Sequence, residues 1–197
     1  MNVNDKVSME YEARVMVSES EYQKMRVDYL KIGGICREFT NKNTYFDSQN
    51  LYLTNQHMVL RIRAIDDEER ELTLKIKEKD GDIEVTHKIE SEEEYQSILS
   101  GNINDIDIIN EISSRGGDVS SLKVVTTLIT ERLEIEFDNY LLVVDKNFYN
   151  DKIDFNIEVE STSRELAQKY LIDVISKYGI AYKKDYISKS RRAILKL

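Results

Sequence analysis

The chain has 197 residues, and this length predicts a single domain over 1–197. A formal net charge of −9 argues against a general nucleic-acid binder, which needs a basic surface. The single cysteine, Cys36, excludes an intramolecular disulfide. The sequence begins without an apolar signal segment, and no apolar run reaches membrane-spanning length. We therefore expect a cytoplasmic protein with no membrane partner.

Strand patterns dominate the first half of the chain. Alternating residues predict strands at 8–17, 35–47, 57–66, 69–79 and 82–90. A helix is expected over 18–31, where Ser18 and Glu21 form a capping box and Gly33-Gly34 ends the segment.

The second half alternates between helices and strands. Helices are predicted at 91–100 and 103–115, and strands at about 122–137, 140–146 and 152–160. An amphipathic helix over 161–178 carries Leu166, Tyr170, Ile172 and Ile175. A basic tail over 182–197 closes the sequence. About eight strands in one antiparallel system, with helices outside it, is the natural architecture.

Two Glu-x-Glu strands, one near each end of the chain, are the most informative feature. Because side chains alternate across a strand, Glu10 and Glu12 share one face with Arg14. Glu158 and Glu160 share a face in the same way. A solvated outer face gives the same pattern, so one such strand on its own has no functional meaning.

Basic residues repeat this alternation on other strands. Arg61 and Arg63 lie on one face of their strand, and Lys75 and Lys77 on one face of the next. Lys88 shares a face with Glu90, and Arg132 shares a face with Glu134. Each of these strands therefore has one apolar and one charged face.

Two arrangements satisfy this pattern. In the first, the apolar faces point inward and the charges are solvated. In the second, helices cover the apolar faces from outside and the charges line the lumen of a barrel. Four amphipathic helices favour the second arrangement, because a small barrel that fills its own interior has little use for them.

The charged strands also carry a family resemblance. Glu10-Tyr11-Glu12-Ala13-Arg14 resembles the ExExK signature of the CYTH family, the triphosphate tunnel metalloenzymes. The similarity continues in order over nearly the whole chain and is greatest to the compact bacterial branch. Its further elements are Tyr45-Phe46-Asp47, Leu60-Arg61-Ile62-Arg63, Leu74-Lys75-Ile76-Lys77, Lys88-x-Glu90, Arg132, Asp145, the strand with Asp154, Glu158 and Glu160, and the terminal Lys189 and Arg192.

The resemblance implies an α+β fold: an eight-stranded antiparallel β-barrel, the triphosphate tunnel, with helices packed on the outside. It also implies a small-molecule triphosphate substrate and a divalent cofactor, Mg²⁺ or Mn²⁺, which carboxylates suit. The expected metal ligands are Glu10, Glu12, Asp145, Glu158 and Glu160. The expected substrate-binding residues are Arg14, Arg61, Arg63, Lys75, Lys77, Lys88, Arg132, Lys189 and Arg192.

Metal-dependent hydrolysis of a triphosphate, with inorganic tripolyphosphate favoured, is the expected enzymatic activity. Arg61 and Arg132 are the expected catalytic residues. Adenylate cyclase, a thiamine or nucleoside triphosphatase, and a non-catalytic polyphosphate or nucleotide sensor are the alternatives. The chain departs from the family pattern at Arg14, where Lys is usual, at Lys88, where Arg is common, and at Asn156, where Glu is frequent.

Overall fold

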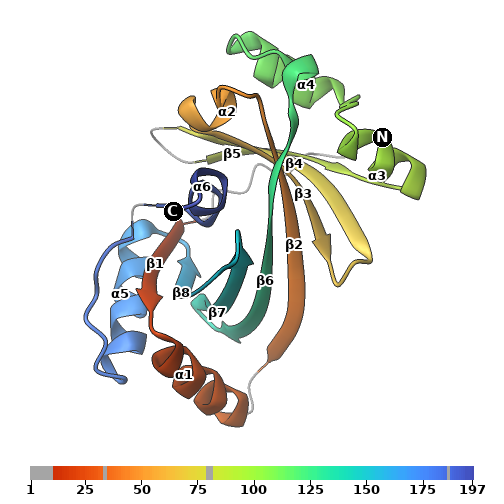
Figure 1. Ribbon diagram of the computed structural model, residues 1–197. Coiled ribbons are helices and arrows are strands. Elements are labelled where there is room, and N and C mark those ends of the chain that lie inside the picture. Colours follow the sequence, from red (N-terminus) through yellow and green to blue (C-terminus); the bar gives the residue numbers. More distant parts are fainter. Residues whose placement is uncertain (1–10, 33–34, 79–81, 186) are drawn as a thin grey trace. The chain divides into compact units, whose positions relative to one another are not determined.

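Eight strands and six α-helices form the described part of the chain, which comprises residues 11–32, 35–78, 82–185 and 187–197 of a computed structural model (Figure 1). The strands are β1 (Tyr11–Val17), β2 (Cys36–Asp47), β3 (Met58–Ile65), β4 (Glu69–Lys77), β5 (Asp82–Lys88), β6 (Lys123–Phe137), β7 (Tyr140–Tyr149) and β8 (Lys152–Ser161). The helices are α1 (Glu19–Ile32), α2 (Tyr52–Asn55), α3 (Glu92–Leu99), α4 (Ile106–Ser114), α5 (Arg164–Ser176) and α6 (Lys189–Leu195), with a short 3₁₀-helix at Val119–Ser121.

All eight strands belong to one sheet, in the order β1-β8-β7-β6-β2-β3-β4-β5. The pairs β1–β8, β8–β7, β7–β6, β3–β4 and β4–β5 are antiparallel. This confirms the predicted fold class, an antiparallel eight-stranded α+β fold with helices outside the sheet.

The described residues divide into two compact units. Unit 1 contains Lys42–Leu128 and Lys189–Leu197, and unit 2 contains 11–41 and Ile129–Ser188. The boundaries fall inside β2 and inside β6, so each unit includes part of these two strands.

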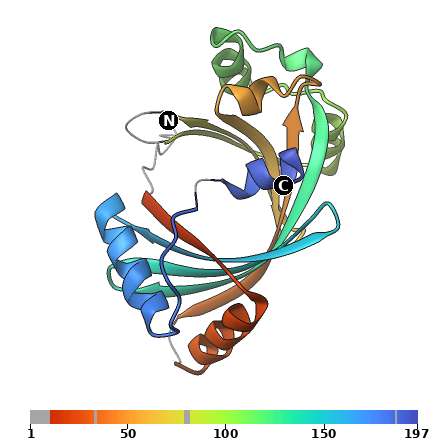
Figure 2. The same cartoon turned by 60° about the vertical axis from the view of Figure 1, so that its left-hand side comes forward.

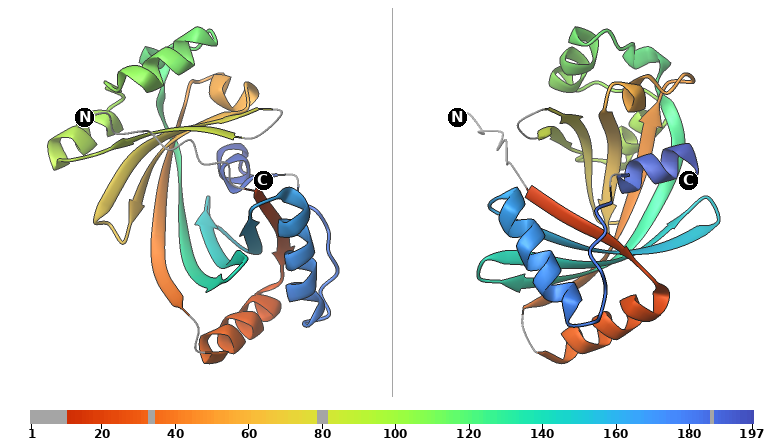
Figure 3. Two further views of the ribbon diagram at one scale, coloured as in Figure 1. Left: turned by 180° about the vertical axis from the view of Figure 1, so that it is seen from behind. Right: turned by 90° about the vertical axis from the view of Figure 1, so that its left-hand side faces the viewer.

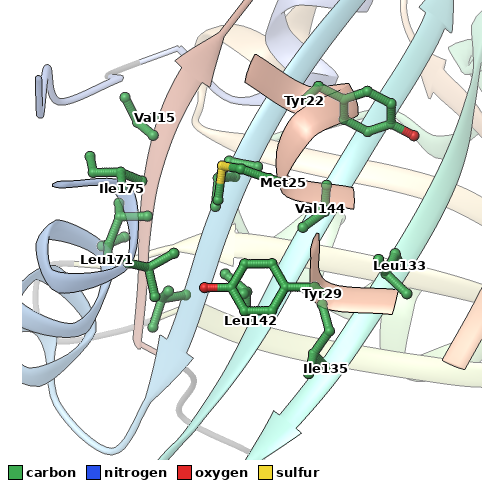
Figure 4. Packing of buried hydrophobic residues seen from close by; sticks show 14 of the residues in the cluster. Val15, Tyr22, Met25, Tyr29, Leu133, Ile135, Leu142, Val144, Leu171 and Ile175 are labelled. Carbon is green, nitrogen blue, oxygen red and sulfur yellow. The ribbon is translucent and has the colours of Figure 1, made fainter. Parts of the chain in front are cut away.

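In unit 2, α1 and α5 cover the apolar face of β1, β7 and β8 (Figure 2). Tyr22, Met25 and Tyr29 follow one another on α1 at intervals of three and four residues, which places them on one face of the helix. Figure 4 shows these side chains above Leu142 and Val144 of β7. Ala13, Val15, Ile157 and Val159 lie in the same core, with Ala167, Leu171, Val174 and Ile175 of α5.

In unit 1, α2, α3 and α4 lie on one side of β3, β4 and β5 (Figure 3). Leu60 and Ile62 of β3 are at most 1% exposed, and Ile108 and Ile112 of α4 are fully buried with them. The same core contains Leu72, Leu74, Ile76, Leu53 and Ile98. The apolar strand faces therefore lie beneath helices, as the second of the two arrangements predicted.

Local signals explain several helix starts. The Ser18–Glu21 capping box is confirmed: the Ser18 amide donates to Glu21 Oε2 at 2.7 Å, and the Glu21 amide donates to Ser18 Oγ at 3.3 Å. α4 begins only at Ile106 because Asp105 is its N-cap, accepting from the amides of Asp107 and Ile108.

Two details differ from the sequence prediction. α2 was not predicted. In α5 the buried residues are Ala167, Leu171, Val174 and Ile175, whereas Ile172 is 37% exposed. Ile172 was therefore wrongly assigned to the apolar face. Gly33-Gly34, expected to end the first helix, lies outside the described residues.

None of the described helices combines the length and the apolar composition needed to cross a bilayer.

Candidate functional site

The charged face of unit 2 is built by strand register. Arg14 lies opposite Glu158, and Glu12 lies opposite Glu160, where β1 pairs with β8. Arg132 on β6 lies opposite Asp145 on β7. These side chains occupy the strand positions that alternate with the core residues, so the apolar core forces them to the other face of the sheet.

This charged face is buried. The side chains of Asp145 and Glu158 are 0% and 3% exposed, and those of Arg14 and Arg132 are 10% and 15% exposed. Charged groups removed from water need partners, because desolvation costs several kcal/mol for each ion. A solvated outer face, the first of the two arrangements, therefore does not describe these strands.

Arg132 is surrounded by carboxylates. Its Nε and Nη2 donate to the two oxygens of Asp145 at 2.9 Å each, and Nη2 also donates to Glu158 at 3.3 Å. Its Nη1 reaches Glu134 at 3.4 Å. Burial by itself would lower the pKa of Arg132, but Asp145, Glu158 and Glu160 outweigh burial and raise it.

Arg14 is held in a similar way. Its Nη1 lies 3.2 Å from Glu158 and 3.2 Å from Glu12, and its Nε donates to Asp185 at 3.0 Å. Nη2 donates to the backbone oxygen of Ile187 at 3.2 Å. Burial alone would lower the pKa of Arg14, but Glu158, Glu12 and Asp185 raise it. A lysine has only one side-chain nitrogen, so it cannot make the contacts that Nε, Nη1 and Nη2 of Arg14 make.

The donor set of this face fits a hard divalent cation. Among the residues that the structure describes, six carboxylates surround the two guanidinium groups: Glu12, Glu134, Asp145, Glu158, Glu160 and Asp185. An excess of carboxylate oxygen is the chemistry that Mg²⁺ and Mn²⁺ prefer. Across the described ranges no three His, Cys, Asp or Glu side chains are already gathered as a metal-binding group. Glu10 lies outside the described residues.

Unit 1 gathers positive charge around Tyr45. The Tyr45 hydroxyl is hydrogen-bonded by Arg61, and the charges of Arg63 and Arg192 also act on it. Burial raises the pKa of Tyr45, and the three arginines oppose this shift. Tyr45 is 2% exposed, and nothing in the sequence indicated its hydroxyl contact with Arg61.

Arg61 has a buried side-chain nitrogen whose hydrogen bonding is incomplete among the described residues. Its Nε is buried, and within the part of the chain that the structure describes it has no hydrogen-bond partner. A buried guanidinium N–H without an acceptor is unfavourable by about 1–3 kcal/mol or more. An anion bound beside Arg61 would supply that acceptor.

Two further basic residues of unit 1, Arg63 and Lys75, contact polar or acidic side chains. Arg63 contacts Asn43 at 3.4 Å and Glu71 at 3.7 Å. Lys75 lies 2.8 Å from Glu84. Burial alone would raise the pKa of Glu84, but Lys75, followed by Arg61 and Arg63, lowers it.

The outer members of the basic set are more accessible. Lys88 is 74% exposed and lies 3.6 Å from the equally exposed Glu90, and Lys77 is exposed at the end of β4. In α6, Arg192 is buried and Lys189 is half-buried.

The structure thus brings together two subsets of the predicted site. Unit 2 groups Glu12, Arg14, Arg132, Asp145, Glu158 and Glu160. Unit 1 groups Arg61, Arg63 and Arg192 around Tyr45, with Lys75 beside Glu84. Convergence of all these residues on one cavity stays a prediction.

Comparison with known proteins places the chain among similar sequences. The family model for the CYTH domain matches residues 8–193. A Bacillus subtilis protein named "Putative triphosphatase YjbK" is 23% identical over 145 residues, which cover 73% of this chain and 74% of that protein.

Two solved structures share the fold. A Bacillus halodurans protein described as a candidate adenylate cyclase is 25% identical, with a TM-score of 0.82 over 94% of this chain and 97% of that one. A Hippeastrum protein, described as a candidate adenylyl cyclase with a dominant triphosphatase activity, is 20% identical, with a TM-score of 0.72 over 93% of each chain.

Proposed function

Because the chain belongs to the CYTH domain family, we propose that it is a metal-dependent triphosphatase. The observation that carries this proposal is the basic cluster of unit 1, in which Arg61, Arg63 and Arg192 act on the buried Tyr45 hydroxyl. The Nε of Arg61, which has no hydrogen-bond partner among the described residues, suits a phosphate oxygen, since guanidinium N–H groups form strong charge-assisted hydrogen bonds with phosphate. The resemblance to the B. subtilis protein supports the same activity.

Each charged cluster has its own role in the proposal. Arg61 and Arg63 donate hydrogen bonds to phosphate oxygens, and Lys75 adds a compact positive charge. Glu12, Glu158 and Glu160 hold Mg²⁺ or Mn²⁺, with Glu10 as the further ligand that the family signature implies. When bound, the cation neutralises phosphate oxygens and makes an attacking water more acidic.

Inorganic tripolyphosphate is the substrate that we favour. The positions that share the charged face of β3 and β4 with Arg61 are Val59, Arg63, Ile65, Glu69, Glu71, Thr73, Lys75 and Lys77. None of these residues is aromatic, so these two strands offer no ring on which a base or a thiazole stacks. A bare chain of phosphates needs only the positive charges.

A phosphate-release screen tests the proposal. The full chain is incubated with tripolyphosphate, ATP, GTP and thiamine triphosphate, each with Mg²⁺ or Mn²⁺. We expect phosphate release to be fastest from tripolyphosphate and to stop in excess chelator. Undiminished release in chelator would contradict metal dependence. Tight binding of tripolyphosphate without release from any substrate would make the chain a sensor.

Cyclisation of ATP is the second candidate, supported by the 25% identical B. halodurans protein described as a candidate adenylate cyclase. The same incubations distinguish the two reactions by their products. Hydrolysis releases orthophosphate, whereas cyclisation releases pyrophosphate together with cyclic AMP.

A further inference from the structure

Arg61 differs from the neighbouring basic residues because it has no carboxylate partner. Arg63 lies 3.7 Å from Glu71, and Lys75 lies 2.8 Å from Glu84. Among the described residues Arg61 forms no ion pair, and its buried Nε has no hydrogen-bond partner. Groups other than carboxylates therefore surround this guanidinium.

Strand positions place Tyr45 beside Arg61. β2 and β3 are neighbours in the sheet, and Arg63 Nε of β3 donates to Asn43 Oδ1 of β2 at 3.4 Å. Side chains two residues apart on a strand share a face, so a step of two residues from this contact leads to Tyr45 on β2 and to Arg61 on β3. Arg61 donates a hydrogen bond to the Tyr45 hydroxyl there. The oxygen of this hydroxyl therefore serves as an acceptor.

The hydrogen of the Tyr45 hydroxyl needs an acceptor of its own. A phenolic hydroxyl both accepts and donates, whereas a guanidinium only donates. The arginines that act on this hydroxyl are Arg61, Arg63 and Arg192, and none of them can accept its hydrogen. No hydrogen bond from Tyr45 to an acceptor is found among the described residues, and at 2% exposure the residue is also shielded from bulk water.

The Tyr45 hydroxyl keeps its hydrogen because the residue is buried. Burial raises the pKa of Tyr45, and the three arginines offset only part of this shift. A neutral phenol is thus held among three positive charges. These charges also make its O–H group a better donor, because they stabilise negative charge on the oxygen.

The Tyr45 O–H and the Arg61 Nε–H together suit an oxyanion. Both donors are buried, they belong to side chains in contact, and neither has an acceptor among the described residues. A phosphate group presents several oxygens and can accept from both. A lysine at position 45 would add a fourth positive charge beside three arginines, whereas a phenol donates without repelling them.

We propose that the Tyr45 hydroxyl donates a hydrogen bond to a phosphate oxygen of the substrate, beside the hydrogen bond from Arg61. This inference rests on the proposed function, and it makes Tyr45 a substrate-binding residue. The hydroxyl then accepts from the guanidinium and donates to the phosphate, so each of these hydrogen bonds strengthens the other.

The first test measures binding without turnover. Inorganic tripolyphosphate is titrated calorimetrically, in excess chelator, into the full-length wild type, Tyr45→Phe and Tyr29→Phe. Tyr29 is the matched control, because it is similarly buried but lies on α1 in the apolar core of unit 2. We expect the dissociation constant to rise at least about fivefold in Tyr45→Phe and to stay within about twofold in Tyr29→Phe. A smaller rise in Tyr45→Phe, or an equal rise in Tyr29→Phe, would overturn the inference.

The second test separates donation to phosphate from the holding of Arg61. Tyr45 is replaced by meta-fluorotyrosine, whose electron-withdrawing fluorine makes the O–H a better donor and the oxygen a poorer acceptor. The titration is done near pH 6, well below the ordinary pKa of a phenol, which is about 10. We expect tripolyphosphate to bind about twofold tighter than to wild type. Unchanged or weaker binding would show that the hydroxyl serves only as an acceptor for Arg61, and would overturn the inference.

The two variants also cover a failure to fold and a failure of the proposed function. The fluorotyrosine keeps the hydroxyl and the shape of the ring, so it decides the inference if Tyr45→Phe does not fold. A wild type that binds tripolyphosphate but releases phosphate from no triphosphate would remove the proposed function, while the binding comparison would still decide the role of Tyr45. A wild type that binds no tripolyphosphate would overturn the inference.

Discussion

Arg14 Nε lies 3.0 Å from Asp185 Oδ2, although 171 positions separate these residues in the sequence. Both side chains are about nine-tenths buried. Asp185 also accepts a hydrogen bond of 2.9 Å from the Ile187 amide, and the Ile187 oxygen accepts one from Arg14. Arg14, the last residue of the N-terminal Glu-x-Glu-x-Arg motif, therefore holds the segment just before α6 in place.

Replacing Asp185 by Asn should loosen this anchor. A lost charge-assisted hydrogen bond costs about 1.5–3 kcal/mol, so trypsin should cleave after the nearby Lys183 and Lys184 about tenfold faster or more. The cleavage sites and rates are measured by mass spectrometry. Asp138→Asn, a change at an exposed turn, is the matched control and should cleave like wild type. Equal rates in both variants would show that the Arg14–Asp185 contact does not hold the segment.

Glu158→Gln should reduce both activity and stability. Turnover should fall at least about a hundredfold if Glu158 holds the metal. The structure places Glu158 between Arg14 and Arg132, so its loss leaves two buried cations undercompensated, at a cost of about 3 kcal/mol.

Glu160→Gln is the matched comparison for Glu158→Gln. Glu160 acts on Arg132 by charge and is only half-buried. Replacing Glu160 should lower activity. Its loss of stability should be less than about half that of Glu158→Gln, because fewer buried charges depend on Glu160. Urea unfolding and phosphate release measure the two effects. Equal stability losses in the two variants would contradict the assigned contacts.

Arg61→Ala should weaken triphosphate hydrolysis more than the replacement of any exposed lysine by alanine does. Loss of its hydrogen bonds to phosphate should lower kcat/KM by about 1.5–3 kcal/mol, which is about 10-fold to 150-fold. Tyr45→Phe should give a smaller loss, since it removes only the hydroxyl that holds Arg61. Lys123→Ala, an exposed change in the same unit, is the control. Full activity in Arg61→Ala would remove Arg61 from the site.

The Lys75–Glu84 pair should make stability depend on pH. The folded-state pKa of Glu84 lies below its ordinary value of 4.5, so the ionised form is favoured in the folded chain. Its contribution is complete above that ordinary value and is lost as pH falls through the lowered folded value. The difference in unfolding free energy between wild type and Glu84→Gln should therefore shrink from pH 7 to pH 3. A difference that is constant with pH would contradict the ion pair.

Local patterns in the sequence predicted much of the fold, because strands alternate with a period of two. The alternation separated Leu60 and Ile62 from Arg61 and Arg63, and the structure buries the first pair beneath helices. The capping box at Ser18 was equally local.

Contacts between distant segments were not predictable in this way. The ion pair of Arg14 with Asp185 depends on tertiary packing, and no periodic pattern marks Asp185. α2 was missed because it is only four residues long and is held by the buried Asp47, which accepts from the amides of Leu53 and Thr54. The hydroxyl contact of Tyr45 was missed because an aromatic residue in a strand is ordinarily explained by burial alone.

The pairing of β1 with β8 has a consequence for the order in which the protein forms during synthesis. β6, β7 and β8 follow one another through tight turns, so their contacts are local and close quickly. Arg14, in contrast, meets Glu158 across 144 positions. β1, which is synthesised first, therefore stays unpaired with β8 until most of the chain has left the ribosome. Its Glu12 and Arg14 stay in water until then. Ribosome-bound chains that stop before β8 should therefore lack the contacts of Arg14 and Arg132 with Glu158, however long they are given to fold.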